Sequence, residues 1–188
     1  MSSNKKEIES LAQTWRNCGI DEGDTILIHS SIKRTIQNIT KKGIIFNADD
    51  LLQSFIEAVG INGTLVFPLF NFNFKEEKFF DFNKTISHMG LLTETARLHP
   101  ESVRTGHPMY SFCAIGKESN KFKIIDNKSA FGKNSPFALI RELDGKIGAL
   151  DLEENSSMTF YHHVEEMNNV DYRYHKDFEG VYVDESGI

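Results

Sequence analysis

The stretch Thr25-Ile26-Leu27-Ile28-His29-Ser30-Ser31 decides the fold class, because a β-branched and apolar run passes directly into polar residues. Such a run is typical of a short strand that is buried on both faces, as in a parallel sheet. A second run of the same kind, residues 64–67, ends at Pro68, which cannot continue a central strand. The two runs predict neighbouring buried strands.

Helical patterns alternate with these strands. The first helix is marked by four residues at helical spacing: Ile8, Leu11, Trp15 and Cys18. Asn47 and Asp50 then mark a capped helix start, and the apolar stripe that follows closes at Gly60. The order helix–strand–helix–strand predicts an α/β fold, which we expect to be a three-layer α/β/α sandwich around a central, mostly parallel sheet.

The remaining elements are predicted from shorter patterns. Strands are expected at 110–115 and 146–152, and helices at 91–98, from Ser135 onward, and at 156–167. Residues 71–87 have no clean period and are interpreted as a long loop over the carboxyl edge of the sheet. Residues 168–188 suggest a hairpin, a small β appendage at the C-terminal end. We therefore expect a domain at 1–167 and a C-terminal β-rich extension at 168–188; whether this extension is truncated stays open.

Composition limits the classes of function. The chain has 188 residues, a net charge of −6 and 39% hydrophobic residues, which suits one domain with a sizeable core. The acidic balance argues against general nucleic-acid binding, and the lack of a long apolar run argues against a membrane span. Cys18 and Cys113 lie far apart and are expected to be reduced core thiols. With no apolar signal-peptide core at the N-terminus, a cytoplasmic location is expected.

One segment offers a candidate for acid–base chemistry: Thr159-Phe160-Tyr161-His162-His163-Val164-Glu165. At a spacing of three on a helix, His162 and Glu165 share one face. An imidazole beside a carboxylate is a usual preparation for a general base near neutral pH. His163 points about 100° away on a helix and is the weaker candidate. Taken alone, this pattern favours the interpretation of His162 as a core histidine.

Five further segments form an ordered set with residues 159–165. They are residues 24–31, 63–68, 89–94, 104–111 and 132–136. With these, the chain resembles the antibiotic N-acetyltransferase family, whose best-known members are the aminoglycoside 3-N-acetyltransferases. The resemblance implies transfer of an acetyl group from acetyl-CoA, as co-substrate, to an amine of an aminoglycoside or related amino sugar. It implies direct transfer without a metal, and a small-molecule amine acceptor as partner. A homodimer stays open.

The resemblance also implies roles for individual residues. It places His162 as general base, with Glu165 and His107 as further catalytic residues. Backbone donors near Ser30 and Ser31, or at a helix start, would stabilise the thioester oxyanion. The residues expected to bind the cofactor are His29, Ser30, Ser31, Lys33, Arg104, Ser111 and Ser135. Glu94 is expected to be structural. Glu153, Glu154, Glu166 and Asp171 would add to an acidic substrate patch, although an ordinary solvated face is the alternative.

The chain departs from the family in two ways. Residues 149–155 differ from the Gly-Val-Gly-like turn that many members carry there, and the chain is shorter than typical members. The acceptor therefore stays open between an aminoglycoside and an amino sugar of surface polysaccharide biosynthesis. One rival is a metal-dependent hydrolase built on His29, His107, His162 and His163. Another rival is a fold that binds a ligand without turnover.

Overall fold

The computed structural model describes residues 4–152 and 157–188. Its central sheet has five strands in the order β4-β5-β2-β1-β6. Their bounds are β1 (Thr25–Ser30), β2 (Thr64–Pro68), β4 (Val103–Arg104), β5 (Phe112–Gly116) and β6 (Lys146–Leu150). β1 pairs in parallel with β2 and β6, whereas β5 runs antiparallel to β2 and β4. The prediction of an α/β fold with a mostly parallel central sheet is confirmed.

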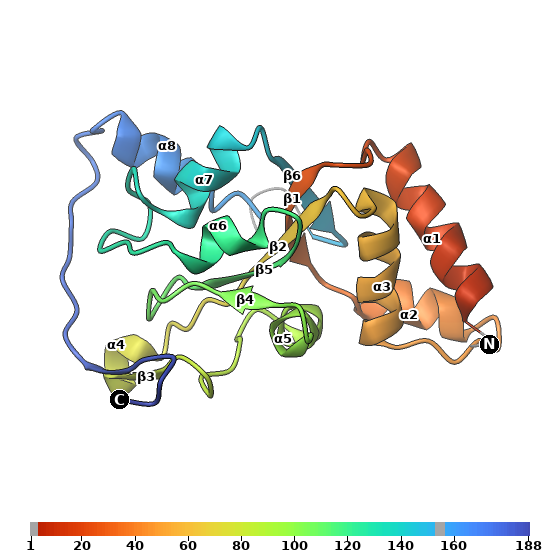
Figure 1. Ribbon diagram of the computed structural model, residues 1–188, viewed down its shortest axis with the longest axis horizontal. Coiled ribbons are helices and arrows are strands. Elements are labelled where there is room, and N and C mark those ends of the chain that lie inside the picture. Colours follow the sequence, from red (N-terminus) through yellow and green to blue (C-terminus); the bar gives the residue numbers. More distant parts are fainter. Residues whose placement is uncertain (1–3, 153–156) are drawn as a thin grey trace.

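Helices lie on two sides of this sheet (Figure 1). One group is α1 (Lys5–Asn17), α2 (Lys33–Thr40) and α3 (Ala48–Val59), and the other is α6 (Ser119–Lys123), α7 (Pro136–Glu142) and α8 (Tyr161–Met167). α5 (Leu91–Leu98) packs between α3 and the sheet strands β2 and β5. Alternate residues of β1 face the two groups, since Ile26 and Ile28 join one buried cluster and Leu27 joins the other.

The N-terminal helices form as their sequence predicts. Asn47 and Asp50 make a reciprocal capping box at the start of α3. The indole of Trp15 stacks on Phe55 at 4.8 Å and donates from Nε1 to Ser54 Oγ at 2.8 Å, which fixes α1 on α3. Cys18 lies exposed at the end of α1 instead of in the core, whereas Cys113 is buried; both are free thiols.

Two segments differ from the sequence-based prediction. Residues 71–87, expected to be a loop, contain α4 (Phe74–Glu77) and β3 (Phe79–Asp81). The expected C-terminal hairpin is wrong, because β7 (Val181–Val183) pairs in parallel with β3 in a second, two-stranded sheet. The edge of β3 supplies hydrogen-bond partners for the backbone of β7, so β7 does not need a second strand from the tail itself. In Figure 1 the tail crosses from α8 to β3 as an extended segment.

The helix predicted at 156–167 is shorter than expected. α8 begins at Tyr161, and residues 153–156 lie outside the described part of the chain. Within that part, no helix combines the length and the apolar character that a membrane crossing demands.

Candidate active site

His162 and Glu165 meet on one face of α8, as the spacing predicts. The imidazole Nδ1 lies 2.9 Å from Glu165 Oε2, and the two side chains are 36% and 21% exposed. In the neutral ring, the contact with Glu165 suits a proton on Nδ1, because the carboxylate only accepts, whereas the contact of the same nitrogen with the donor-only guanidinium of Arg173 suits a lone pair there. The pKa of Glu165 is lowered, first by this hydrogen bond and also by the charge of Arg173, although partial burial opposes both. The pair thus has the form of a general base with an orienting carboxylate.

His163, the neighbour of the candidate base, has a different environment. It is only 1% exposed, and its Nδ1 lies 2.6 Å from the carbonyl oxygen of Phe131. The ring therefore carries its proton on Nδ1, and its buried Nε2 has no hydrogen-bond partner among the residues that the structure describes. This contact anchors α8 to the segment that precedes α7. His163 is more deeply buried than the sequence suggested, and its role is structural.

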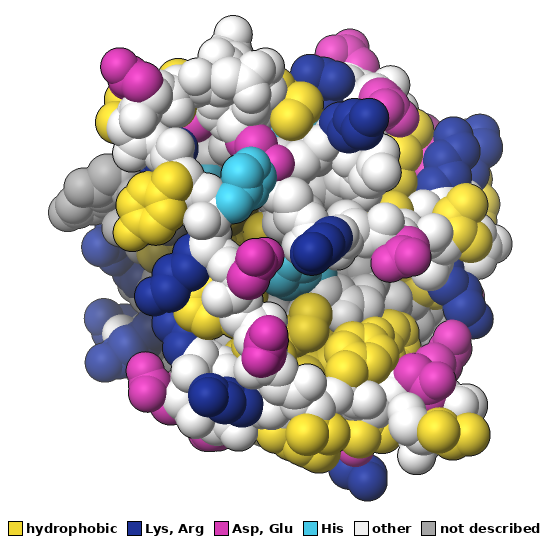
Figure 2. Space-filling model, turned by 90° about the vertical axis from the view of Figure 1, so that its left-hand side faces the viewer, with side chains coloured by type: hydrophobic (Ala, Val, Ile, Leu, Met, Phe, Trp, Pro, Cys, Tyr) yellow, Lys and Arg dark blue, Asp and Glu magenta, His cyan; other side chains and the backbone are white. Residues whose placement is uncertain are grey.

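Phe131 connects the two histidine segments of the predicted site. Its ring lies 5.1 Å from the ring of His162 and 4.8 Å from that of Tyr110, both edge-on. Tyr110 in turn lies 5.9 Å from the ring of His107. The structure therefore brings the segments around His107 and His162 to one region of the molecule. Histidine side chains show on this side among acidic and basic ones (Figure 2).

Two residues of the tail contact the pair, and the sequence analysis assigned a role to neither. Arg173 Nη2 lies 2.6 Å from Glu165 Oε2 and also contacts His162 Nδ1. The Tyr172 hydroxyl donates to Glu165 Oε1 at 3.3 Å. The local sequence gave one indication that the chain turns back after α8. Asn169 follows the helix, and asparagine favours the left-handed conformation in which many helices end.

That turn is a Schellman motif. Asn169 has a φ of +49°, its N–H donates to the carbonyl of Glu166, and the next N–H, that of Val170, donates to Glu165. The chain therefore reverses beyond α8 and returns along it, which places Tyr172 and Arg173 beside Glu165.

His107 organises a turn. Its Nδ1 accepts from the N–H groups of Met109 and Tyr110 at 3.2 and 3.1 Å. Burial lowers its pKa from 6.5 to about 4, although a hydrogen bond with the backbone of Lys128 opposes this. A cavity of about 520 Å³ adjoins His107 and is also lined by Asp126, Tyr182 and Asp184. The volume is in the range of small-molecule sites. The catalytic role of His107 stays a prediction.

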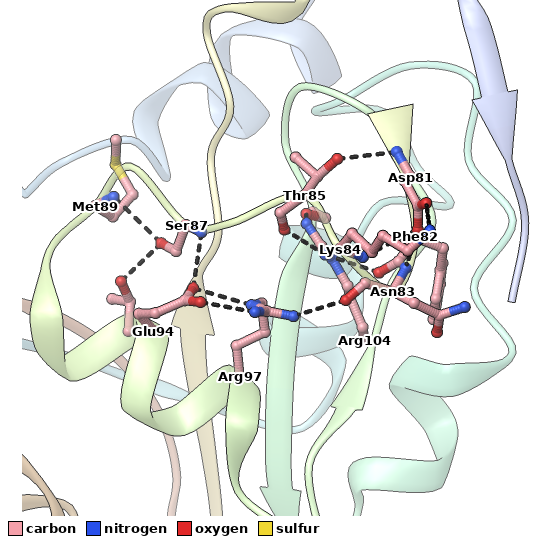
Figure 3. A network of polar contacts seen from close by, with 12 residues as sticks. Asp81, Phe82, Asn83, Lys84, Thr85, Ser87, Met89, Glu94, Arg97 and Arg104 are labelled. Atoms are coloured by element: carbon pink, nitrogen blue, oxygen red, sulfur yellow. Dashed lines mark hydrogen bonds and ion pairs between the residues drawn. The ribbon is translucent and has the colours of Figure 1, made fainter. Parts of the chain in front are cut away.

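Arg104 and Ser111 lie in a buried polar network. Arg104 Nη1 donates to the carbonyls of Phe82 and Thr85 at 2.8 and 2.7 Å (Figure 3). Its Nη2 donates to Ser111 Oγ at 3.3 Å. Burial and the nearby charge of Arg97 lower the pKa of Arg104 to about 10. These contacts are those of a side chain that holds a loop in place, and the cofactor role of both residues stays a prediction.

Glu94 belongs to the same region. Its carboxylate accepts a bidentate pair from Arg97 and the backbone N–H of Ser87 (Figure 3). The interpretation of Glu94 as structural agrees with these contacts.

The other predicted cofactor residues gather near the carboxyl end of β1, apart from Ser135. His29 is 6% exposed, and burial lowers its pKa from 6.5 to about 4. Ser31 and Lys33 are exposed, but the N–H of Ser31 donates to the carbonyl of Leu150 at 2.8 Å. That N–H is therefore not available to an oxyanion. Ser135 caps α7 and accepts from Ala138, as predicted.

The acidic residues near α8 divide into different environments. Both oxygens of Glu166 accept from Ser129 Oγ, at 2.7 and 2.8 Å, whereas Asp171 is exposed. Glu153 and Glu154 lie outside the described residues. Across residues 4–152 and 157–188, no three His, Cys, Asp or Glu side chains gather in a manner that would hold a metal ion.

Comparison with known proteins tests the resemblance. The family model described as aminoglycoside 3-N-acetyltransferase matches residues 27–187. The chain belongs to this family. The match covers both histidine segments, the carboxyl end of β1 and the tail with Arg173, and it confirms the family prediction.

Two relatives show the similarity at the level of sequence. The SPbeta prophage-derived aminoglycoside N(3')-acetyltransferase-like protein YokD of Bacillus subtilis (strain 168) is 25% identical over 178 residues, 81% of this chain and 62% of the relative. Aminoglycoside N(3)-acetyltransferase IV of Salmonella sp is 27% identical over 149 residues, 77% of this chain and 53% of the relative. This family member thus spans between about half and two thirds of the length of these relatives.

Solved structures share the fold. AAC-IIIb in its binary complex with CoASH has a TM-score of 0.80 at 21% identity, over 96% of this chain and 72% of that one. The apoenzyme of aminoglycoside acetyltransferase AAC(3)-IVa has a TM-score of 0.75 at 27% identity, over 88% of this chain and 62% of that one. The architecture of the family is therefore present in this chain.

Proposed function

We propose that this protein is a coenzyme A-dependent N-acetyltransferase that transfers an acetyl group from acetyl-CoA to an amine of an aminoglycoside. The observation that carries the proposal is the hydrogen-bonded pair of His162 and Glu165, half exposed on α8, in a member of this family. The similar structure of AAC-IIIb is a binary complex with CoASH, and that likeness supports coenzyme A as the carrier of the acetyl group here.

The proposed reaction is direct transfer. The acceptor ammonium first loses one proton to solvent, so that the amine attacks in its neutral form; His162 Nε2 then takes a second proton from the attacking nitrogen, and Glu165 stabilises the imidazolium through Nδ1. The amine nitrogen attacks the thioester carbonyl carbon and forms the new C–N bond. The C–S bond breaks, the thiolate of coenzyme A leaves, and the proton held by His162 returns to sulfur or to solvent. Atoms and charge balance without a metal or a covalent acyl-enzyme.

The oxyanion needs donors other than the N–H of Ser31. The half-exposed hydroxyl of Ser30 is one candidate. The first N–H groups of α2 are another, because they have no carbonyl partner within their own helix. One of them is already used, since the N–H of Thr35 donates to Asp151 Oδ2 at 3.2 Å. We assign the oxyanion to Ser30 and to the N–H of Lys33.

The family and the ligands of similar structures favour an aminoglycoside acceptor. One AAC-VIa structure is bound to sisomicin, and one AAC(3)-IVa variant is in complex with apramycin. We extend that class of acceptor to this chain, with a cytoplasmic location. We likewise propose that the two helix groups and the sheet form the three-layer sandwich of the first prediction, with residues 168–188 as a C-terminal extension of that domain.

Thiol release from acetyl-CoA tests the proposal. Purified protein is incubated with acetyl-CoA and, in turn, with a panel of aminoglycosides and of amino-sugar nucleotides. Release that depends on an aminoglycoside and is lost in His162→Ala supports the proposal. Release only with an amino-sugar nucleotide would move the acceptor to polysaccharide biosynthesis. No release with any acceptor, together with no heat of binding for coenzyme A, would contradict the proposal.

A further inference from the structure

The Nδ1 nitrogen of His162 faces two partners with opposite demands. Glu165 Oε2 lies 2.9 Å away and only accepts, whereas the guanidinium of Arg173, which contacts the same nitrogen, only donates. Arg173 Nη2 also lies 2.6 Å from Glu165 Oε2, so the guanidinium lies against both members of the pair. One nitrogen cannot carry a proton for the carboxylate and a lone pair for the guanidinium at the same time.

Proton uptake by His162 decides which of the two contacts must break. A histidine that takes up a proton on Nε2 becomes an imidazolium, and both ring nitrogens then donate. Its Nδ1–H would face the donor-only guanidinium of Arg173, and two positive charges would lie against each other. The contact between Arg173 and Nδ1 therefore cannot persist when His162 acts as a base, whichever tautomer precedes the reaction.

The tail beyond Arg173 has few contacts that would hold this side chain in place. The turn at Asn169 directs Arg173 toward α8, but in the described part of the chain the N–H groups of residues 174–180 find no acceptor. Residues 171–180 are all exposed, and β7, which pairs with β3, is the next segment with backbone hydrogen bonds. Exposure and sparse backbone hydrogen bonds are typical of a segment that opens locally.

We propose that Arg173 makes an autoinhibitory contact: docked on Glu165 and on Nδ1 of His162, it opposes proton uptake by the base, and the tail must undock before His162 can act. The inference rests on the proposed function, because it adds a conformational step to the same site. In the undocked state, Glu165 is free to accept from the Nδ1–H of the imidazolium, which is the arrangement that the transfer reaction uses.

Exposure of the ion pair limits the size of the effect. The Arg173 and Glu165 side chains are 47% and 21% exposed, and a pair at such a site favours its docked form by about two- to fivefold. Since only the undocked molecules are competent, this population lowers kcat/KM for the acceptor by about three- to sixfold. Removal of the contact restores that factor.

Steady-state acetyl transfer measures this factor. Arg173→Met should raise kcat/KM for the acceptor by about three- to sixfold, because every molecule is then undocked, while KM for acetyl-CoA stays within about twofold. Lys176→Met is the matched control and should leave kcat/KM unchanged, since it removes a cation from the same tail, where the ammonium lies 5.2 Å from the Phe178 ring. An unchanged or lower kcat/KM in Arg173→Met would overturn the inference.

The protonation of His162 tests the inference without any substrate. Nitrogen chemical shifts of ¹⁵N-histidine-labelled protein report the imidazolium fraction of each ring, and the signal of His162 is assigned by its loss in His162→Ala. At about pH 6.5, where an ordinary imidazole is half protonated, the ratio of imidazolium to neutral ring should rise about three- to sixfold in Arg173→Met. An unchanged or lower ratio would overturn the inference.

The two failures are distinguishable. A higher imidazolium ratio in Arg173→Met without acetyl transfer by any variant would uphold the action of Arg173 on His162 and contradict the proposed function. Transfer by the wild type with an unchanged ratio and an unchanged kcat/KM in Arg173→Met would overturn the inference and uphold the function. An equal rise of kcat/KM in Lys176→Met would assign the effect to the charge of the tail, which also overturns the inference.

Discussion

Acid will destabilise this fold through two buried histidines, His29 and His107. Burial lowers the pKa of each ring from 6.5 to about 4. The unfolded chain therefore takes up a proton on each ring near pH 6.5, whereas the folded chain does so only near pH 4. The stability that these rings contribute is complete above pH 6.5 and is lost as the pH falls from 6.5 toward 4.

The magnitude follows from the size of the shifts. Between pH 7.5 and 5.0, a ring with these two values loses about 2 kcal/mol of the free energy of unfolding, and the pair loses about 4 kcal/mol. At His107 the loss has a structural counterpart, because protonation of Nδ1 would break its bonds from the N–H groups of Met109 and Tyr110.

Urea unfolding of the wild type, His29→Gln and His107→Gln at the two pH values measures the effect. Each variant should lose about 2 kcal/mol less than the wild type between pH 7.5 and 5.0, whatever its stability at pH 7.5. His175→Gln, in the exposed tail, should lose as much as the wild type. The reasoning is refuted if His29→Gln and His107→Gln show the full pH-dependent loss of the wild type.

Three further substitutions test single contacts. Ser135→Ala removes the cap that accepts from Ala138 and should lower the free energy of unfolding by about 1 kcal/mol in urea; an unchanged urea midpoint would contradict the cap. Arg104→Met leaves two partly buried carbonyls without their donor and should cost about 2 kcal/mol and speed proteolysis within 82–87, so equal cleavage rates would argue against the network. Asn169→Val places a β-branched residue at a φ of +49° and should lower the free energy of unfolding in urea by about 1–2 kcal/mol, whereas Asn169→Gly should not; equal values for the two variants would speak against the turn.

Local patterns in the sequence predicted the elements that are fixed locally. The strands β1 and β2, the capping box at Asn47 and the cap at Ser135 all depend on residues within four positions of one another. The spacing of His162 and Glu165 likewise gave their contact correctly.

Elements that depend on distant partners were not predictable in this way. α2 has no side-chain cap of its own, and Asp151, which lies 116 residues further along, binds the N–H and hydroxyl of Thr35. β3 forms only because the tail supplies β7 as a partner. Arg173 belongs to no motif that could be recognised in the sequence. Its contact with Glu165 follows from the turn at Asn169, which places the two side chains beside each other.

The measurement that tests the account most directly is single-turnover acetyl transfer by the wild type and by His162→Gln, with saturating acetyl-CoA and the acceptor found in the thiol-release panel. Loss of a general base predicts a transfer rate lower by about 10²–10⁴-fold in the variant, with the affinity for acetyl-CoA unchanged. His162→Gln keeps the size and polarity of the side chain, so the fold should survive. Transfer by the variant at the wild-type rate would contradict the assignment of His162 as the general base.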